Sequence, residues 1–446
     1  MTEDLFVPAN TRDSLAATLA KLKLDLFAGL RSVELQSFGW TDPTSNAAQS
    51  LWTNVNVATC LLQARLTFPN ATALLKSVAD ARVITMGGQG WTSDYIPDQV
   101  SIYVTADVAE FYMFAGDSQA AGITLQELLG MQNTDGGWGI CSGDVESKTR
   151  PTSLMLRILS QVHRLPALHT QQISTAIVGA VKWQTDAHVD HDGGWSSRQG
   201  AKNSDLSSTI DALGALAAVL VSNQTGLGAS AIRTSQLQSA VTYVLRHFER
   251  GNFSGPPEEI VGYQVAGRKY SHSVSGLGPV SALSAVVDLI NSKTIPPNHQ
   301  LLAITLQEFK RRCVPIKDAN GVWVYPSEQG GAPVVWNSGL AIETIFRLEL
   351  LLIKLEAEGL VERTLRPMAS TGTNHWRTST IALCVLLISA LVVASGITES
   401  ISKKFSLMSP LVQGLVLTVV GLVAQGIITW LSRAFKAQFE NKTVAK

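Results

Sequence analysis

Charge is scarce and balanced in this chain of 446 residues. The sequence holds 35 basic and 35 acidic residues, so its formal net charge is zero, and only 16% of its residues are charged. A protein without a basic excess has no overall field that would attract nucleic acid. Nucleic-acid binding through net charge is therefore excluded, and the charged fraction is low for a soluble protein.

The sequence also lacks closely spaced cysteine pairs, the apolar core of a secretory signal and sustained alternation of polar and apolar residues. The four cysteines lie far apart, without a Cys-x-x-Cys pair: Cys60, Cys141, Cys313 and Cys384. This excludes a disulfide scaffold or a Cys-rich zinc site and favours a reducing compartment. The first ten residues are polar and lack the apolar core of a secretory signal. No sustained alternation of polar and apolar residues occurs, so few strands are expected.

A glycine-tryptophan turn recurs through the chain. Its fullest copy, Gln132–Gly139, is Gln-Asn-Thr-Asp-Gly-Gly-Trp-Gly, and the next copy contains Asp190-His191-Asp192, acidic residues of the kind that cap and close a turn. An apolar run that starts with small or hydroxylated residues follows each copy. The tryptophans fall roughly 50 residues apart in the first four copies, and a looser copy comes later. These repeat anchors are Trp40, Trp91, Trp138, Trp195 and Trp323.

A repeat of this length holds two helices and their loops, which predicts an all-α fold. Six helix pairs over residues 1–362 would form a closed (α/α)6 toroid, an inner barrel of helices inside an outer ring. One pair cannot bury its apolar face alone, whereas closing the ring buries every face. The indoles are expected to pack between neighbouring repeats as structural wedges.

The Gln-x-x-Asp-Gly-Gly-Trp-Gly turn and the paired-helix repeat resemble the prenyltransferase and squalene-cyclase repeat superfamily. The resemblance covers roughly residues 35–350. It implies an (α/α)6 toroid with a central, largely apolar cavity. One fold hosts several chemistries, so the resemblance alone does not assign an activity.

Neither catalytic signature of that superfamily is complete. The Asp-x-Asp-Asp motif of class II cyclases is absent, which disfavours a cyclase of the squalene–hopene type. The zinc prenyltransferases of the superfamily use Asp, Cys and His; here Asp205 and His272 match in type, but Ser207 replaces the cysteine. A serine hydroxyl is a poor zinc ligand compared with a thiolate. Asp205 and His272 thus remain candidate zinc ligands, against the alternative of a helix N-cap and a polar residue on a cavity rim.

The mouth of the barrel offers a second kind of site. The N-termini of the inner helices converge there, and their dipoles favour anions. Arg150, just before an inner helix, could hold a diphosphate or carboxylate head group while the barrel holds an apolar tail; the alternative is a solvated loop charge. Six residues near these helix starts are the ligand-binding candidates: Tyr103, Arg150, Asp205, His272, Trp336 and Asn337. Asn54, Asn56 and Asp107 lie near the helix starts as well.

The composition changes after residue 362. A basic linker, 363–377, precedes two uncharged apolar runs, 379–398 and 405–432, each as long as the roughly 20 residues that cross a bilayer. Together they predict a transmembrane helical hairpin within 378–446; the alternative is a pair of buried soluble helices.

The flanking charges and small residues suggest how this hairpin is used. Lys and Arg are more frequent in the flanks than in the connecting loop. The positive-inside rule then places the toroid and the C-terminal tail on the cytoplasmic side of an inner or plasma membrane. Gly414, Gly421 and Gly426 mark one face of the second run, where homo-oligomerisation or packing within the hairpin would bring helices close.

Two functions from different classes follow from this organisation. The first is a membrane-anchored toroid that binds an isoprenoid-like or lipid ligand in its cavity; if it is an enzyme, it is a transferase or isomerase. The second is a bacterial sensor or effector, of a conflict or antiphage-defence type, whose toroid senses a ligand or protein and whose hairpin oligomerises to act on the membrane. A scaffold for a protein partner is a third. The incomplete signatures leave catalysis open, with zinc the one cofactor considered.

Overall fold

The computed structural model describes residues 9–32, 34, 39–40, 50–85, 88–93, 98–162, 171–222, 229–252, 260–265, 268–273, 278–312, 316–317, 323–324 and 335–365. The chain divides into two compact units, Met1–Glu358 and Gly359–Lys446. No helix within the described ranges is both long and apolar enough to cross a membrane. The predicted spans 379–398 and 405–432, with Gly414, Gly421 and Gly426, lie outside those ranges.

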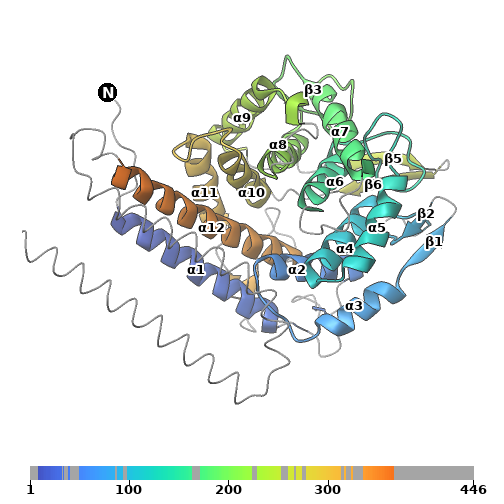
Figure 1. The fold of residues 1–446 in the computed structure, drawn as a ribbon, viewed down its shortest axis with the longest axis horizontal. Helices are drawn as coiled ribbons and strands as arrows, with labels where there is room; N and C mark the ends of the chain where they lie inside the picture. Colours follow the sequence, from blue (N-terminus) through green and yellow to red (C-terminus); the bar gives the residue numbers. More distant parts are fainter. Residues whose placement is uncertain are drawn as a thin grey trace, which may run out of the picture. The chain divides into compact units, whose positions relative to one another are not determined.

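Twelve α-helices make up the described part of the first unit and its continuation to residue 365. Helices α2, α4, α6, α8 and α10 contact one another in sequence, and α12 is joined to α10 by the ion pair of Arg347 with Asp288; these six form the inner layer (Figure 1). Helices α3, α5, α7, α9 and α11 each pack beside an inner helix, and Lys23 on α1 pairs with Glu349 on α12. The inner helices are α2 (Leu51–Gln63), α4 (Ile102–Ala115), α6 (Thr149–Gln161), α8 (Leu206–Val221), α10 (Gly278–Asn291) and α12 (Val335–Leu365). The outer helices are α1 (Ala9–Ser32), α3 (Ala71–Asp80), α5 (Ser118–Gly130), α7 (Gln171–Asp186), α9 (Thr234–Glu249) and α11 (Gln300–Arg312).

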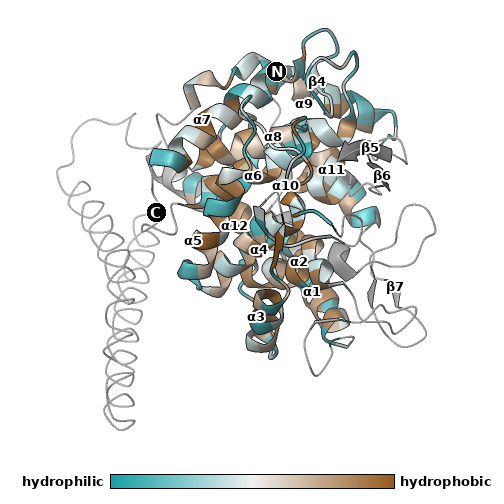
Figure 2. Ribbon diagram, turned by 90° about the vertical axis from the view of Figure 1, so that its right-hand side faces the viewer, coloured by the Kyte–Doolittle hydropathy of each residue, from teal (hydrophilic) through white to brown (hydrophobic). Residues whose placement is uncertain are grey.

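The inner layer closes on itself. Gly339 on α12 lies against Val57 and Cys60 on α2, so the last inner helix packs on the first. The apolar runs expected from the sequence fall on the inner helices, and the buried apolar side chains form one continuous core. Figure 2 shows hydrophobic residues concentrated on the helices and hydrophilic ones in several connecting loops. The ring therefore buries the faces that a single helix pair would leave exposed.

The strands in the described part are short antiparallel hairpins between helices. They pair as β1 (Val83–Thr85) with β2 (Gly88–Gly90), β3 (His188–Val189) with β4 (Gly194–Trp195), β5 (Ile260–Val265) with β6 (Arg268–Ser273), and β7 (Ile316–Lys317) with β8 (Trp323–Val324). A two-stranded hairpin has little stability of its own, so these depend on the helices around them.

The glycine-tryptophan turn at Trp138 joins three parts of its repeat. The backbone N–H of Trp138 donates to the hydroxyl of Thr152 on the inner helix α6 at 3.0 Å, and its carbonyl accepts from the N–H of Lys148 at 2.8 Å. The indole N–H donates to the carbonyl of Leu128 on the outer helix α5 at 2.8 Å. The turn thereby fixes the start of one helix to the end of the previous one.

This arrangement repeats with constant spacing. In four copies the backbone N–H of the tryptophan donates to a side-chain oxygen 14 residues later, at 2.9–3.1 Å. The pairs are Trp40–Asn54, Trp91–Thr105, Trp138–Thr152 and Trp195–Thr209. All four indoles are buried, with at most 3% of their surface exposed. Trp323 lies on β8, with its side chain outside the described residues.

The glycine before each tryptophan makes room for this contact. A Cβ on Gly137 would lie 2.5 Å from the Cβ of Ser147, and one on Gly194 would lie 2.5 Å from the hydroxyl of Thr209. Real Cβ atoms are not found at such distances, so only glycine lets the turn approach the inner helix.

Candidate functional site

Charged side chains extend across the interior of the ring. We call six of them, all on inner helices, the lumen cluster: Asp107, Glu110, Arg157, Asp288, Glu343 and Arg347. The four carboxylates are each at most 8% exposed. A buried ion is costly unless a partner compensates it.

Arg347 on α12 binds the residues of the cluster region that α10 contributes. Its guanidinium donates to the carboxylate of Asp288 and to the hydroxyl of Ser284, and lies 3.8 Å from Glu343. Burial alone would lower the pKa of Arg347, but the charges of Asp288 and Glu343 outweigh burial and raise it above its ordinary value. Arg347 is therefore a fixed positive charge with its own partners.

Two carboxyl groups on α4 form the opposite side. Glu110 accepts from the amides of Gln63 at 2.8 Å and Gln161 at 2.9 Å, which links α2, α4 and α6. Asp107 accepts from the indole N–H of Trp52 at 2.5 Å.

Burial sets the ionisation of these two carboxyl groups. It raises the pKa of Asp107 from 3.8 to about 7; the nearby Glu110 charge adds to this, while the Trp52 hydrogen bond and the Arg157 charge oppose it. Burial also raises the pKa of Glu110, against the charge of Arg157. Asp107 can thus gain or lose a proton near neutral pH.

Arg157 on α6 differs from the other arginines of the lumen. Its positive charge is felt by Asp107 and Glu110, but within the described part of the chain no hydrogen bond or ion pair holds its guanidinium. Instead it lines a cavity between α6, α8, α10 and α12. The cavity is about 420 Å³ in volume, including the part open to solvent.

The lining of this cavity is mixed. The polar residues that line it are Arg157, Asp211, Ser281, Ser284, Asp288, Glu343 and Thr344. Apolar side chains such as Ile210 and Leu340 alternate with them. The resemblance implied a largely apolar cavity; the structure instead places ions and hydroxyls on the wall, because inner helices α6, α8, α10 and α12 each contribute a charged residue there.

Two predicted site residues have structural partners. Arg150 donates through Nε to the carboxylate of Asp211 at 2.7 Å and so ties α6 to α8. Asp205 is the N-cap of α8 and accepts from the N–H of Ser208 at 2.6 Å. That contact is the alternative considered for Asp205, and Ser207 lies in the first turn of the same helix.

The remaining predicted residues are distributed around the helix starts. Asn54 is occupied by the N–H of Trp40, Asp107 belongs to the lumen cluster, and Tyr103 lies in the first turn of α4. His272 lies on β6 opposite Val261; its side chain and those of Trp336 and Asn337 fall outside the described part. Among the residues described, no three His, Cys, Asp or Glu side chains gather as a metal site.

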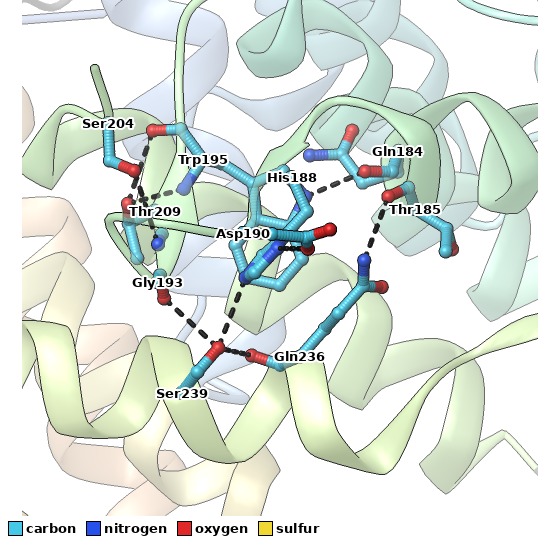
Figure 3. A network of polar contacts seen from close by, with 11 residues as sticks. Gln184, Thr185, His188, Asp190, Gly193, Trp195, Ser204, Thr209, Gln236 and Ser239 are labelled. Carbon is cyan, nitrogen blue, oxygen red and sulfur yellow. Dashed lines mark hydrogen bonds and ion pairs between the residues drawn. The ribbon is translucent and has the colours of Figure 1, made fainter. Parts of the chain in front are cut away.

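The acidic turn after α7 forms a separate network (Figure 3). His188 contacts Asp190 through Nδ1 at 2.8 Å and the hydroxyl of Ser239 through Nε2 at 3.2 Å. This is the order of a nucleophile–base–carboxylate triad. The Ser239 hydroxyl, however, also lies 3.3 Å from the carbonyl of Gly193 and 3.0 Å from that of Gln236, so its one proton has competing acceptors. We assign the network to holding the β3–β4 turn on α9.

Sequence reasoning missed most of the lumen cluster. Glu110, Arg157, Asp288, Glu343 and Arg347 each interrupt an apolar run, as in Ala-Val-Val-Asp-Leu-Ile at 285–290. Single ions inside otherwise apolar inner helices were the available signal, because such residues are rarely buried without a partner or a function.

The architecture of the described residues is similar to that of solved structures, although no sequence match was found. No protein-family model matches the chain, and no curated protein sequence matches it. Among solved structures, a glycoside hydrolase family 76 mannosidase from Bacteroides thetaiotaomicron VPI-5482 aligns with a TM-score of 0.52 and 10% identity, over 76% of this chain and 100% of that one. A cellobiose 2-epimerase from Bacillus thermoamylovorans B4167 aligns at 0.50 with 11% identity, over 74% and 99%. A type II terpene cyclase from Scytonema aligns at 0.45 with 12% identity, over 75% and 99%.

These identities establish the fold and no activity. Together with the closed inner layer, the first two likenesses confirm the predicted class: the described body is an α/α toroid. The score of the terpene cyclase is too low to favour one branch of such proteins over another. The chemistry of this chain has to be argued from its own lumen.

Proposed function

We propose that the toroid binds a small ligand through an anionic group held by Arg157 in the central cavity. The observation that carries this proposal is the contrast among three arginines of the inner helices. Arg150 is paired with Asp211 and Arg347 with Asp288, whereas the guanidinium of Arg157 lines the cavity without such a partner in the described residues. An anion entering the cavity would therefore meet one arginine whose donors are available.

The guanidinium suits this role physically. Its donors form a planar fork that matches a carboxylate or phosphate with two parallel hydrogen bonds. In a partly buried site the attraction is screened less than at the surface. A membrane-derived isoprenoid or lipid phosphate has the required group, as does a soluble phosphate or carboxylate.

We further propose that the C-terminal hairpin tethers the toroid to the cytoplasmic face of an inner or plasma membrane. Support comes from the sequence: runs 379–398 and 405–432 carry no charge, and the Lys and Arg residues lie mainly in their flanks. A tethered toroid would sample ligands that partition into or gather at the bilayer. Fractionation with alkaline carbonate tests this tether, and release of the intact protein into the soluble fraction would contradict it.

Native mass spectrometry of the full-length protein tests the ligand proposal. We expect a small molecule to co-purify with the wild type and to be lost in Arg157→Gln, which removes the charge and keeps a polar side chain. Arg246→Gln is the matched control, because Arg246 is exposed on the outer helix α9. Equal occupancy in Arg157→Gln and in the wild type would contradict the proposal. So would a wild type that purifies empty and stays empty with added inorganic phosphate.

A second candidate function is a sensor or effector whose hairpin acts on the membrane. The small residues Gly414, Gly421 and Gly426 and the incomplete enzyme signatures favour it. Expression of the full-length chain should then depolarise cells, and Gly421→Leu should suppress depolarisation by separating the helices. An unchanged membrane potential under expression would contradict this candidate and favour a passive tether.

A further inference from the structure

The acids of the cavity restrict which anion can fill it. Asp211 receives a hydrogen bond from Arg150 at Oδ2, and Asp288 receives one from Arg347 at Oδ1. A carboxylate has about four acceptor positions on its two oxygens. Each of these carboxylates therefore has unused acceptor capacity, and both line the cavity.

Glu343 adds a third carboxylate to the same wall. Arg347 lies 3.8 Å away, beyond hydrogen-bond distance, and the thiol of Cys60 lies 3.6 Å from Oε2 as a weak donor. Thr344, beside it on α12, is only 2% exposed and faces the cavity. An isoprenoid chain packed here would offer no donor to these oxygens and would leave them unsatisfied in the interior, which is unfavourable.

The ion pairs of the wall leave its acids able to accept from a ligand. Arg150 pairs with Asp211 and Arg347 with Asp288, whereas Glu343 receives no hydrogen bond from an arginine in the described residues. Hydroxyl groups satisfy carboxylate oxygens without changing the balance of charge between Arg157 and Glu343.

The wall of the cavity alternates polar and apolar groups. Apolar patches from Ile210, Val280 and Leu340 separate the polar groups on the wall. Such a surface fits a molecule with polar groups on its edges and carbon atoms between them.

Resting on the proposed anion site, we propose that the ligand is a hydroxylated anion: a phosphorylated or carboxylated sugar or polyol. Arg157 binds its anionic group, and Asp211, Asp288 and Glu343 accept from its hydroxyls. The specificity of the site then comes from the acids, and its affinity for anions in general comes from the arginine.

Calorimetric titration of the full-length protein in detergent tests the ligand class. The probes are glycerol 3-phosphate, ribose 5-phosphate and glucose 6-phosphate, compared with inorganic phosphate and with farnesyl diphosphate; gluconate is compared with acetate. We expect at least one hydroxylated probe to bind about tenfold or more tightly than its simple anion, a difference that two or three added hydrogen bonds can supply. A phosphate probe and a carboxylate probe together identify which anionic group the site takes.

Two variants separate the contributions of arginine and acid. Arg157→Gln should weaken all anions alike, while Glu343→Leu should reduce the ratio between the affinity for a hydroxylated probe and the affinity for its simple anion. The comparison among probes on the wild type stands even if Glu343→Leu fails to fold.

The outcomes distinguish the two proposals. If farnesyl diphosphate binds more tightly than every hydroxylated probe, or if none of these binds more tightly than its simple anion, the ligand class is wrong and the anion site stands. If no anion binds, both are wrong.

Discussion

The buried carboxyl of Asp107 gives the lumen a testable pH dependence. Folding raises its pKa from 3.8 to about 7, so the folded protein binds this proton more tightly than the unfolded chain does. The stabilisation is fully present below the unfolded pKa and is lost as pH rises through about 7. A shift of this size corresponds to about 4 kcal/mol, with a slope of about 1.4 kcal/mol per pH unit between the two values.

Asp107→Asn removes the titration and keeps an acceptor for Trp52. Other titrating groups contribute to both proteins, so the informative quantity is the difference in free energy of unfolding between wild type and variant. We expect the free energy of unfolding of the variant, relative to that of the wild type, to rise by about 2–3 kcal/mol between pH 5 and pH 7. Above about pH 8 this difference should change little. Urea unfolding followed by tryptophan fluorescence measures this difference at each pH.

The control for this experiment is Asp186→Asn, an exposed acid at the end of α7. Its difference from the wild type should stay constant over the same range. A constant difference for Asp107→Asn would refute the reasoning, because it would mean that the carboxyl has the same proton affinity in the folded and unfolded chains.

Further predictions concern the turn and the helix start. Thr152→Val leaves the N–H of Trp138 unsatisfied and should destabilise the toroid by about 1–3 kcal/mol, whereas Thr152→Ser should cost less than half of that; thermal unfolding of the pair compares them. Gly137→Ala drives a Cβ into Ser147 and should cost about 1–3 kcal/mol or more, and a melting temperature equal to that of the wild type would contradict the packing. Asp205→Ala removes the α8 N-cap and should cost about 1 kcal/mol. Elemental analysis of Asp205→Ala also checks the zinc hypothesis, since zinc bound to the wild type and lost in the variant would restore Asp205 as a ligand.

The toroid was predictable because its signal is repeated. The turn needs glycine for a close approach, tryptophan for the wedge, and an oxygen-bearing side chain 14 residues later, and these requirements recur in the sequence at Trp40, Trp91, Trp138 and Trp195. The hydroxyl or amide partner was the missed part of the motif. Its recognition would have paired Asn54 with Trp40 and removed it from the residues expected at the mouth of the barrel.

The same spacing informs a residue that the sequence analysis placed at the cavity mouth. Trp323 and Asn337 are also 14 residues apart in the sequence, as Trp40 and Asn54 are. The role of Asn337 as a ligand residue stays an untested prediction.

The lumen cluster was harder to predict because its members come from four different helices. Burial and pairing decide what each ion does, and neither follows from one helix alone. Arg150 and Arg157 illustrate this: the arginine at the helix start is paired with Asp211, and the one two turns later lines the cavity. The membrane hairpin and its orientation stay predictions from apolar length and flanking charge.

The most direct test of the Arg157 site is the melting temperature of the full-length protein as inorganic phosphate replaces chloride at constant ionic strength. A ligand that binds the folded state stabilises it by about 2.7 kcal/mol at a hundred times its dissociation constant. We predict that phosphate raises the melting temperature of the wild type and of Arg246→Gln, and leaves Arg157→Gln unchanged. An equal rise in all three proteins would contradict an anion site at Arg157.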